Sequence, residues 1–208
     1  MADEVGIRIV IITGSARPRN YTDMAVALVA DELRKDGKVK VEVIHPAELN
    51  LPLPGVNPKA EGTLKLQAAV KNATAVILAT PEYHGSLSSV MKLAIENLGF
   101  PSVLAGKPVA LLGVAAGSVG AIKSLEQLRS IASHIGAIVL PLPVSVPNVQ
   151  KVFDAEGHVL DPNVDKLVRS LAKSLMDYVH QNLCPAVTLE RVLRGGTAAG
   201  AAAPARGK

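Results

Sequence analysis

The stretch that decides the fold of this chain is residues 8–22, RIVIITGSARPRNYT. Residues 8–13 are mostly β-branched and apolar, which predicts a buried strand. Residues 21–36 predict a helix that Gly37 ends, because apolar side chains recur there at helical spacing: Met24, Ala27, Leu28 and Leu33. A strand that passes through a short loop into a helix is typical of a βαβ unit, so we expect a parallel sheet covered by helices.

The same alternation continues to the end of the predicted core. Four more strands are predicted at 40–44, 75–79, 108–113 and 137–140, and helices at 63–72, 88 or 89 to 98, 122–134 and 163–182. Residues 45–62 contain four prolines and predict a long loop. Five strands of an α/β protein fit both a Rossmann half and a flavodoxin-like sheet. Both bind ligands beyond the carboxyl ends of the strands, so the loops after the first, third and fourth strands are expected to converge.

Composition limits the classes of function. A chain of 208 residues with 49% hydrophobic residues predicts one domain with a sizeable core. The net charge of +4 favours anionic partners, but the 22 Lys and Arg residues are scattered, which argues against nucleic acid. Cys184 is the only cysteine, so neither an internal disulfide nor a cysteine-based metal cluster is expected, and no metal site is predicted. The sequence shows no signal peptide and no apolar run of membrane length, which predicts a cytoplasmic protein without a membrane partner.

The first loop, residues 13–22, predicts a phosphate site. It lies between a strand and a helix start, where unpaired N–H groups and the helix dipole favour an anion. Gly14 is expected to let the backbone turn, and four side chains add donors: Ser15, Arg17, Asn20 and Thr22. Both the P-loop motif and the dinucleotide fingerprint are missing, so a monophosphate is the expected ligand. The alternative is that these residues only cap and turn the chain.

The second loop, residues 80–89, and the third loop, residues 113–120, predict contacts with a flat ligand. In the second loop a rigid Pro81 and an aromatic Tyr83 precede Gly85. Because glycine has no Cβ, the backbone at Gly85 is expected to approach a flat ligand closely. His84 is either an acid or base or, more commonly, polar surface. Glu82 is expected to orient the loop or a subunit contact. The third loop has small side chains, and its backbone amides are suited to stabilising negative charge. The alternative is that the loop is a tight turn whose small residues serve only the packing of helix on sheet.

The sequence resembles the NAD(P)H-dependent FMN reductase family, which includes quinone, azo and chromate reductases. The resemblance lies in GSARPRNYT at 14–22 and TPEYHGSLSSVMKLAIENL at 80–98, in order and each after a predicted strand. It covers roughly residues 7–181. Two positions depart from the family pattern. Leu93 stands where the family often has Asn in the helix after the second loop, and Asn97 stands where the family often has an aromatic residue after that motif. These departures are expected to alter the subunit interface or the acceptor pocket.

The resemblance implies a flavodoxin-like three-layer sandwich whose parallel strands have the order 2-1-3-4-5, with helices on both faces. It implies FMN as cofactor, NADPH or NADH as electron donor, and ping-pong transfer to a small acceptor such as a quinone, azo compound, chromate, ferric chelate or flavin. It also implies a homodimer or homotetramer. The cofactor-binding residues implied are those of the first loop (Ser15, Arg17, Asn20, Tyr21 and Thr22), the second loop (Pro81, Glu82, Tyr83, His84 and Gly85) and the third loop (Ala116, Gly117 and Ser118). No protein nucleophile is required, because the flavin carries the hydride.

Residues 1–183 are predicted as the reductase domain and residues 184–208 as a C-terminal tail. The tail should be disordered from about residue 195, because GGTAAGAAAPARGK contains no large apolar side chain.

Two other functions fit parts of the sequence. A serine hydrolase would use Ser118, since residues 116–120 nearly spell a nucleophile elbow, with Asp154 or Asp161 and His158 or His180 as partners. The first glycine of that motif is Ala116, however, and the hydrolase leaves the first two loops unexplained. An FMN electron carrier would need no donor of its own, but carriers are typically acidic and this chain is basic.

Overall fold

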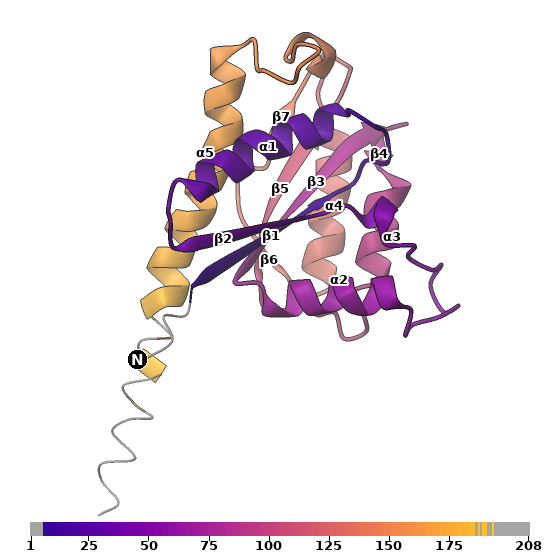
Figure 1. Ribbon diagram of the computed structural model, residues 1–208, viewed down its shortest axis with the longest axis vertical. Helices are drawn as coiled ribbons and strands as arrows, with labels where there is room; N and C mark the ends of the chain where they lie inside the picture. The colour runs from indigo at the N-terminus through magenta and orange to yellow at the C-terminus, as the bar shows by residue number, and fades with distance from the viewer. Residues whose placement is uncertain (1–5, 186, 188, 191–192, 194–208) are drawn as a thin grey trace, which may run out of the picture.

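The computed structural model describes residues 6–185, 187, 189–190 and 193, and a parallel sheet forms its centre (Figure 1). The strand order is β2 (Val39–Ile44), β1 (Ile7–Thr13), β3 (Ala75–Tyr83), β5 (Pro108–Val114) and β6 (Ile138–Val139). Every neighbouring pair in this path is parallel. Counted along the parallel strands, this is the order 2-1-3-4-5, so the predicted sheet is confirmed.

The fifth predicted strand, 137–140, is shorter in the structure, and a second short strand follows it. β6 pairs with the start of β5, and β7 (Val144–Val146), which the sequence did not predict, pairs with its end. Between them Leu142 has a positive φ of 59° and stands between two prolines. Proline has no N–H for a sheet ladder, so the pairing is interrupted and then resumes.

The third predicted strand was too short, because the second loop is a β-hairpin. β3 continues through Tyr83 and turns back as β4 (Ser86–Leu87), with Tyr83 opposite Ser86. The two residues of the turn, His84 and Gly85, have φ values of 52° and 73°. Two positive φ values in a two-residue turn match the twist of paired strands, and glycine adopts this conformation without strain.

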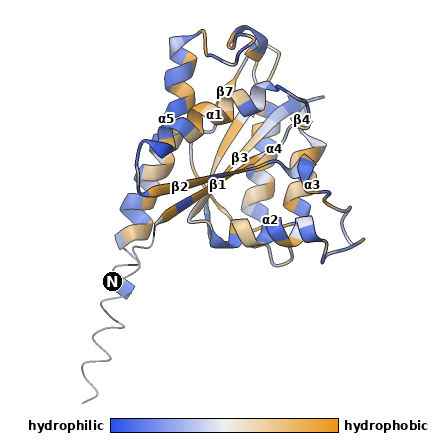
Figure 2. Ribbon diagram, in the orientation of Figure 1, coloured by the Kyte–Doolittle hydropathy of each residue, from blue (hydrophilic) through white to orange (hydrophobic). Residues whose placement is uncertain are grey.

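Helices cover both faces of the sheet. α1 (Tyr21–Arg34) and α5 (Pro162–Tyr178) lie on one face, while α2 (Glu61–Asn72), α3 (Ser89–Glu96) and α4 (Ile122–His134) lie on the other (Figure 1). Each helix contains both apolar and polar residues, as Figure 2 shows, and its buried residues are mainly apolar. All seven residues of β5 are buried, which fits a strand covered on both faces. Aliphatic side chains therefore fill two layers of core, as the low aromatic content predicted.

The remaining elements differ from the prediction only in detail. The proline-rich stretch includes a 3-10 turn, η1 (Pro46–Glu48), and α2 begins two residues early. α1 ends at Arg34 and is capped by Lys35 instead of Gly37. A second 3-10 turn, η2 (Val149–Lys151), follows β7, and a π-helical turn, η3 (Val179–Leu183), follows α5. The stretch predicted to be disordered, residues 195–208, lies outside the described residues. No helix in the described part of the chain is long and apolar enough to cross a membrane.

A charge cluster joins α1 to α5 at the surface. The Arg169 guanidinium on α5 donates to Asp31 on α1 and, at 2.9 Å, to Asp165 on its own helix. Glu32 accepts from Lys35 and lies 3.5 Å from Lys173. The Arg169 hydrogen bond lowers the pKa of the Asp31 carboxyl, and the Lys35 hydrogen bond lowers the pKa of Glu32, against an opposing desolvation effect in both. Both carboxylates therefore bind a proton more weakly in the folded protein than in the unfolded chain.

We expect acid to weaken this cluster. The free energy of unfolding, measured by urea denaturation, should fall from about pH 5 to about pH 3. In this range the two carboxylates are protonated in the unfolded chain but stay ionised to a larger extent in the folded protein. Arg169→Met should be less stable at neutral pH and should lose less stability on acidification. Lys166→Met, an exposed neighbour on the same helix, is the control and should follow the wild type. Parallel pH curves for Arg169→Met and the wild type would show that the cluster does not contribute.

Candidate active site

The predicted loops meet at one cavity of about 860 Å³ beyond the carboxyl ends of β1, β3 and β5. Most of the predicted binding residues line it: Ser15, Arg17, Asn20, Tyr21, Thr22, Pro81, Glu82, Tyr83, His84 and Ala116. Gly85, Gly117 and Ser118 are not among the lining residues. The remaining wall comes from Pro18, Arg19, Val114, Ala115, Val149 and Gln150. The fold therefore brings together three segments that are far apart in the sequence.

Asn20 gives the first loop its shape. Its Oδ1 accepts the Asp23 N–H at 2.9 Å and so caps α1, while its Nδ2 donates to the Arg17 carbonyl at 2.8 Å. Arg19 adopts a positive φ of 50°, which completes the turn into the helix. These contacts engage the Asn20 amide within the loop. Asn20 thus positions the loop for an anion, whereas a direct contact from its side chain to a phosphate stays a prediction.

Gly14 has a different role from the one predicted. It has no positive φ; its N–H donates to the Ala79 carbonyl at 2.7 Å, and its carbonyl accepts from Ser88 Oγ at 2.5 Å. A Cβ at this position would lie 2.9 Å from Ser88 Oγ and 3.0 Å from Met91 Cβ. Glycine is required here because α3 packs directly on the end of β1, and this packing fixes where the first loop begins.

Arg17 reaches across the cavity from the first loop to the hairpin. Its Cζ lies 5.0 Å from the centre of the Tyr83 ring, which is a cation–π contact. Among the described residues no carboxylate forms an ion pair with Arg17. An unneutralised guanidinium beside the N-terminus of α1 makes this end of the cavity attractive to a phosphate.

A backbone N–H and a side chain of α4 hold the hairpin in place. Glu82 Oε2 accepts the Ser124 N–H at 3.0 Å, which caps a helix start whose own N-cap residue, Ala121, has no capping side chain. Gln127 accepts from Ser86 Oγ at 2.7 Å and donates to the Gly85 carbonyl at 3.3 Å. Glu82 therefore orients the second loop, as predicted, by attaching it to α4.

In the third loop, the backbone carbonyls of residues 115–117 are hydrogen-bonded within the protein. The carbonyls of Ala115, Ala116 and Gly117 accept from the Val149 N–H at 3.0 Å, Gln150 Nε2 at 3.1 Å and the Asn148 N–H at 3.1 Å. The N–H groups of residues 116, 117 and 118 donate to no acceptor in the described part of the chain. Packing also shapes this loop, because a Cβ at Gly113 would lie 2.6 Å from Ala121 Cβ. Packing therefore explains the glycine at residue 113, whereas the unbonded amides of residues 116–118 are compatible with binding an anionic group.

These features fit FMN. The cationic first loop suits the phosphate, and the unpaired amides of the third loop suit the oxygens of a flavin pyrimidine ring. Val149 and Gln150 were missed because the preceding strand, β7, was missed. The one signal for them was Pro147-Asn148, a turn dipeptide directly before an apolar residue.

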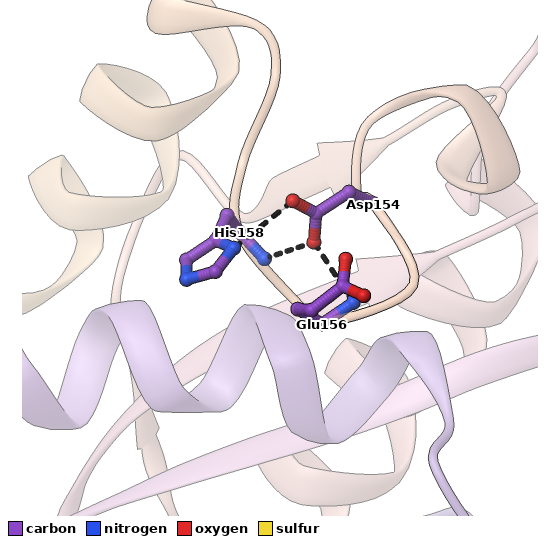
Figure 3. Close-up of side chains that lie close together, drawn as sticks. All are labelled: Asp154, Glu156 and His158. Atoms are coloured by element: carbon purple, nitrogen blue, oxygen red, sulfur yellow. Dashed lines mark hydrogen bonds and ion pairs between the residues drawn. The ribbon is translucent and has the colours of Figure 1, made fainter.

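The other candidate groups lie elsewhere. Ser118 is exposed, and no hydrogen bond in the described structure joins it to a histidine. Asp154, Glu156 and His158 lie close together on an exposed turn (Figure 3). Asp154 accepts from the His158 N–H at 2.7 Å, the His158 ring at 2.9 Å and the Glu156 N–H at 3.0 Å. Although desolvation opposes it, these bonds lower the pKa of Asp154. The hydrogen bonds of the turn account for the cluster.

Asn97, one of the two departures from the family pattern, is buried away from the cavity. It accepts from Thr63 Oγ1 at 2.7 Å and donates to the Pro52 carbonyl at 3.0 Å. Its own carbonyl accepts from Gln67 at 2.9 Å. Asn97 therefore fastens the proline-rich stretch to α2 and α3.

Comparisons with known proteins identify the family of the chain. Residues 7–151 match the family model of the NADPH-dependent FMN reductases. The chain is 27% identical over 187 residues to an NAD(P)H-dependent FMN reductase of Pseudomonas aeruginosa, covering 87% of this chain and 98% of the relative. It is 30% identical over 176 residues to an NADPH azoreductase of Bacillus sp. strain OY1-2, covering 83% and 93%.

A solved structure shows the same fold. The flavoenzyme NAD(P)H:acceptor oxidoreductase FerB from Paracoccus denitrificans superimposes with a TM-score of 0.70 at 22% identity, covering 84% of this chain and 98% of that one. The chain therefore belongs to the NADPH-dependent FMN reductase family, and it is an oxidoreductase with FMN as cofactor and NAD(P)H as electron donor.

Proposed function

We propose that the cavity holds FMN and that the protein passes electrons from NAD(P)H to a small acceptor by a ping-pong mechanism. The acceptors that we propose are quinones, azo compounds, chromate, ferric chelates and free flavin. The observation that carries the proposal is the single cavity into which the first loop, the hairpin and the third loop all converge. Residues 1–183 form the FMN-binding domain in this proposal, and the homodimer or homotetramer stays a prediction.

Each loop has one task in this proposal. Ser15, Arg17 and Thr22, with amides at the start of α1, bind the phosphate, and Asn20 holds their loop in shape. Pro81 to His84 form a wall for the isoalloxazine, which α4 keeps rigid through Glu82 and Gln127. The third loop, where Ala116 lines the cavity, would stabilise negative charge at the pyrimidine end of bound FMN through its backbone amides. Bound FMN supplies the redox chemistry, since it accepts a hydride from the nicotinamide and passes electrons to the acceptor.

The proposal for the electron donor rests on a cationic side chain in the cavity wall. Arg19 lines it, is exposed and has no ion pair with any described residue. With Arg17 assigned to the FMN phosphate, Arg19 is available for the 2′-phosphate of NADPH. We therefore propose NADPH as the preferred donor.

A visible spectrum of the purified protein with FMN tests the proposal. We expect a bound flavin whose absorption near 450 nm bleaches when NADPH is added without oxygen, as flavin reduction requires. Repeating the titration with NADH measures the donor preference. A bound flavin that stays oxidised with both donors would contradict the reductase mechanism. Failure to bind FMN would contradict the assignment of the cavity.

A further inference from the structure

The segment that follows β7 contributes a polar side chain to the cavity beside the third loop. Gln150 lies in η2, is exposed, and lines the cavity with its neighbour Val149. Its Nε2 donates to the Ala116 carbonyl at 3.1 Å, which fixes the side-chain amide against the third loop. No donor in the described part of the chain bonds to its Oε1. Gln150 therefore presents an unused acceptor next to a row of unused donors.

The ends of the cavity differ in chemistry. The first loop, with its unneutralised Arg17, lies at the end of β1, and the third loop lies at the end of β5, with β3 between them. With its phosphate on the first loop, FMN would occupy the rest of the cavity, toward the third loop. The N–H groups of the exposed residues 116–118 have no acceptor in the described part of the chain, and residue 116 lines the cavity. The pyrimidine edge of a flavin offers acceptors to such donors, whereas its dimethylbenzene edge has none. The pyrimidine edge thus belongs at the third loop.

That edge also carries one donor, the N3–H, between its two carbonyl oxygens. A buried donor without an acceptor is costly, so the site needs an acceptor at this end. The backbone carbonyls of residues 115–117 are already engaged by residues 148–150. Val149 is apolar, and the other side-chain oxygens of the cavity wall belong to the first loop and the hairpin.

We propose that Gln150 binds the pyrimidine edge of the flavin, its Oε1 accepting the N3–H while its Nε2 holds the Ala116 carbonyl. This inference rests on the proposed function, and it adds a cofactor-binding residue from outside the three loops. The carbonyl oxygens of the flavin edge would then face amides of the third loop, and the N3–H between them would face the Gln150 acceptor. It also selects for a flavin with a free N3–H.

The test compares two flavins in two variants. The dissociation constants of FMN and N3-methyl-FMN are measured by flavin fluorescence for the wild type and for Gln150→Met, which keeps the side-chain length but loses the acceptor. We expect the substitution to weaken FMN about 3- to 10-fold, the range of one net hydrogen bond, and N3-methyl-FMN less than about 2-fold. Gln150→Glu keeps an acceptor oxygen and should still prefer FMN over N3-methyl-FMN. Lys151→Met, in the same turn but outside the cavity wall, is the matched control and should preserve the wild-type preference.

The outcomes separate the possible roles of Gln150. An equal loss of affinity for both flavins in Gln150→Met would show that the residue acts only by holding the third loop, and would overturn the proposed contact. Unchanged FMN affinity would overturn it as well. As a second readout, the N3–H proton of ¹⁵N-labelled FMN should be protected from exchange in the wild type and exposed in Gln150→Met. A wild type that fails to bind FMN would instead overturn the proposed function itself, and this inference with it.

Discussion

Arg17→Ala is expected to raise the dissociation constant for FMN about 10- to 150-fold, because a hydrogen bond to a charged group contributes about 1.5 to 3 kcal/mol. The loss should be this large because Arg17 has no competing carboxylate among the described residues and lies beside the start of α1. The Tyr83 ring that the guanidinium contacts does not neutralise it. The charge is therefore held across the cavity and available to a phosphate.

Riboflavin, which lacks the phosphate, separates a phosphate contact from a general effect. Fluorescence titration should show that Arg17→Ala changes the affinity for riboflavin much less than the affinity for FMN. Arg19→Ala is the matched control, because it removes the same charge from the same loop and the same cavity wall. Equal losses of FMN affinity in both variants would mean that the loop acts through its total charge, and an unchanged FMN affinity in Arg17→Ala would refute the phosphate assignment.

Gly113→Ala is expected to destabilise the protein by about 1 to 3 kcal/mol, the usual cost of overpacking a well-packed core. The new Cβ would lie 2.6 Å from Ala121 Cβ and 2.9 Å from Leu125 Cγ, so α4 must move away from β5. Thermal unfolding should show a Tm lower by roughly 2 to 12 °C for a domain of this size. Because α4 holds the hairpin through Glu82 and Gln127, FMN affinity should fall as well.

The control for this prediction is Gly37→Ala. No atom lies within 4 Å of a Cβ at Gly37, and its φ is not positive, so the same chemical change should leave the Tm unchanged or raise it slightly. If Gly113→Ala unfolded at the wild-type temperature, α4 would pack less tightly on β5 than the structure shows.

Local patterns were sufficient for most of the fold. The β-branched run at 8–13 and the helical spacing after it predicted β1 and α1, and α4 has the predicted bounds, 122–134. These elements are long and periodic, so local propensity and tertiary packing favour the same conformation. The short strands were different: β4, β6 and β7 have only two or three residues each. Such strands form because a neighbour offers a ladder, and no periodicity can show that in advance.

Within the site, the sequence by itself determined which residue types are present. These are a glycine-led first loop with Ser15, Arg17 and Thr22, a polar second loop with one aromatic residue, and a third loop of residues too small to block a ligand. Only the tertiary structure decided how they are used. It turned Asn20 inward to cap α1, made Gly14 a packing residue, and placed Gln150 against Ala116 from 34 positions away. The physical reason is that residue type and spacing fix which hydrogen bonds a segment is able to make, whereas the partners that satisfy them come from chain segments that only the folded sheet brings together.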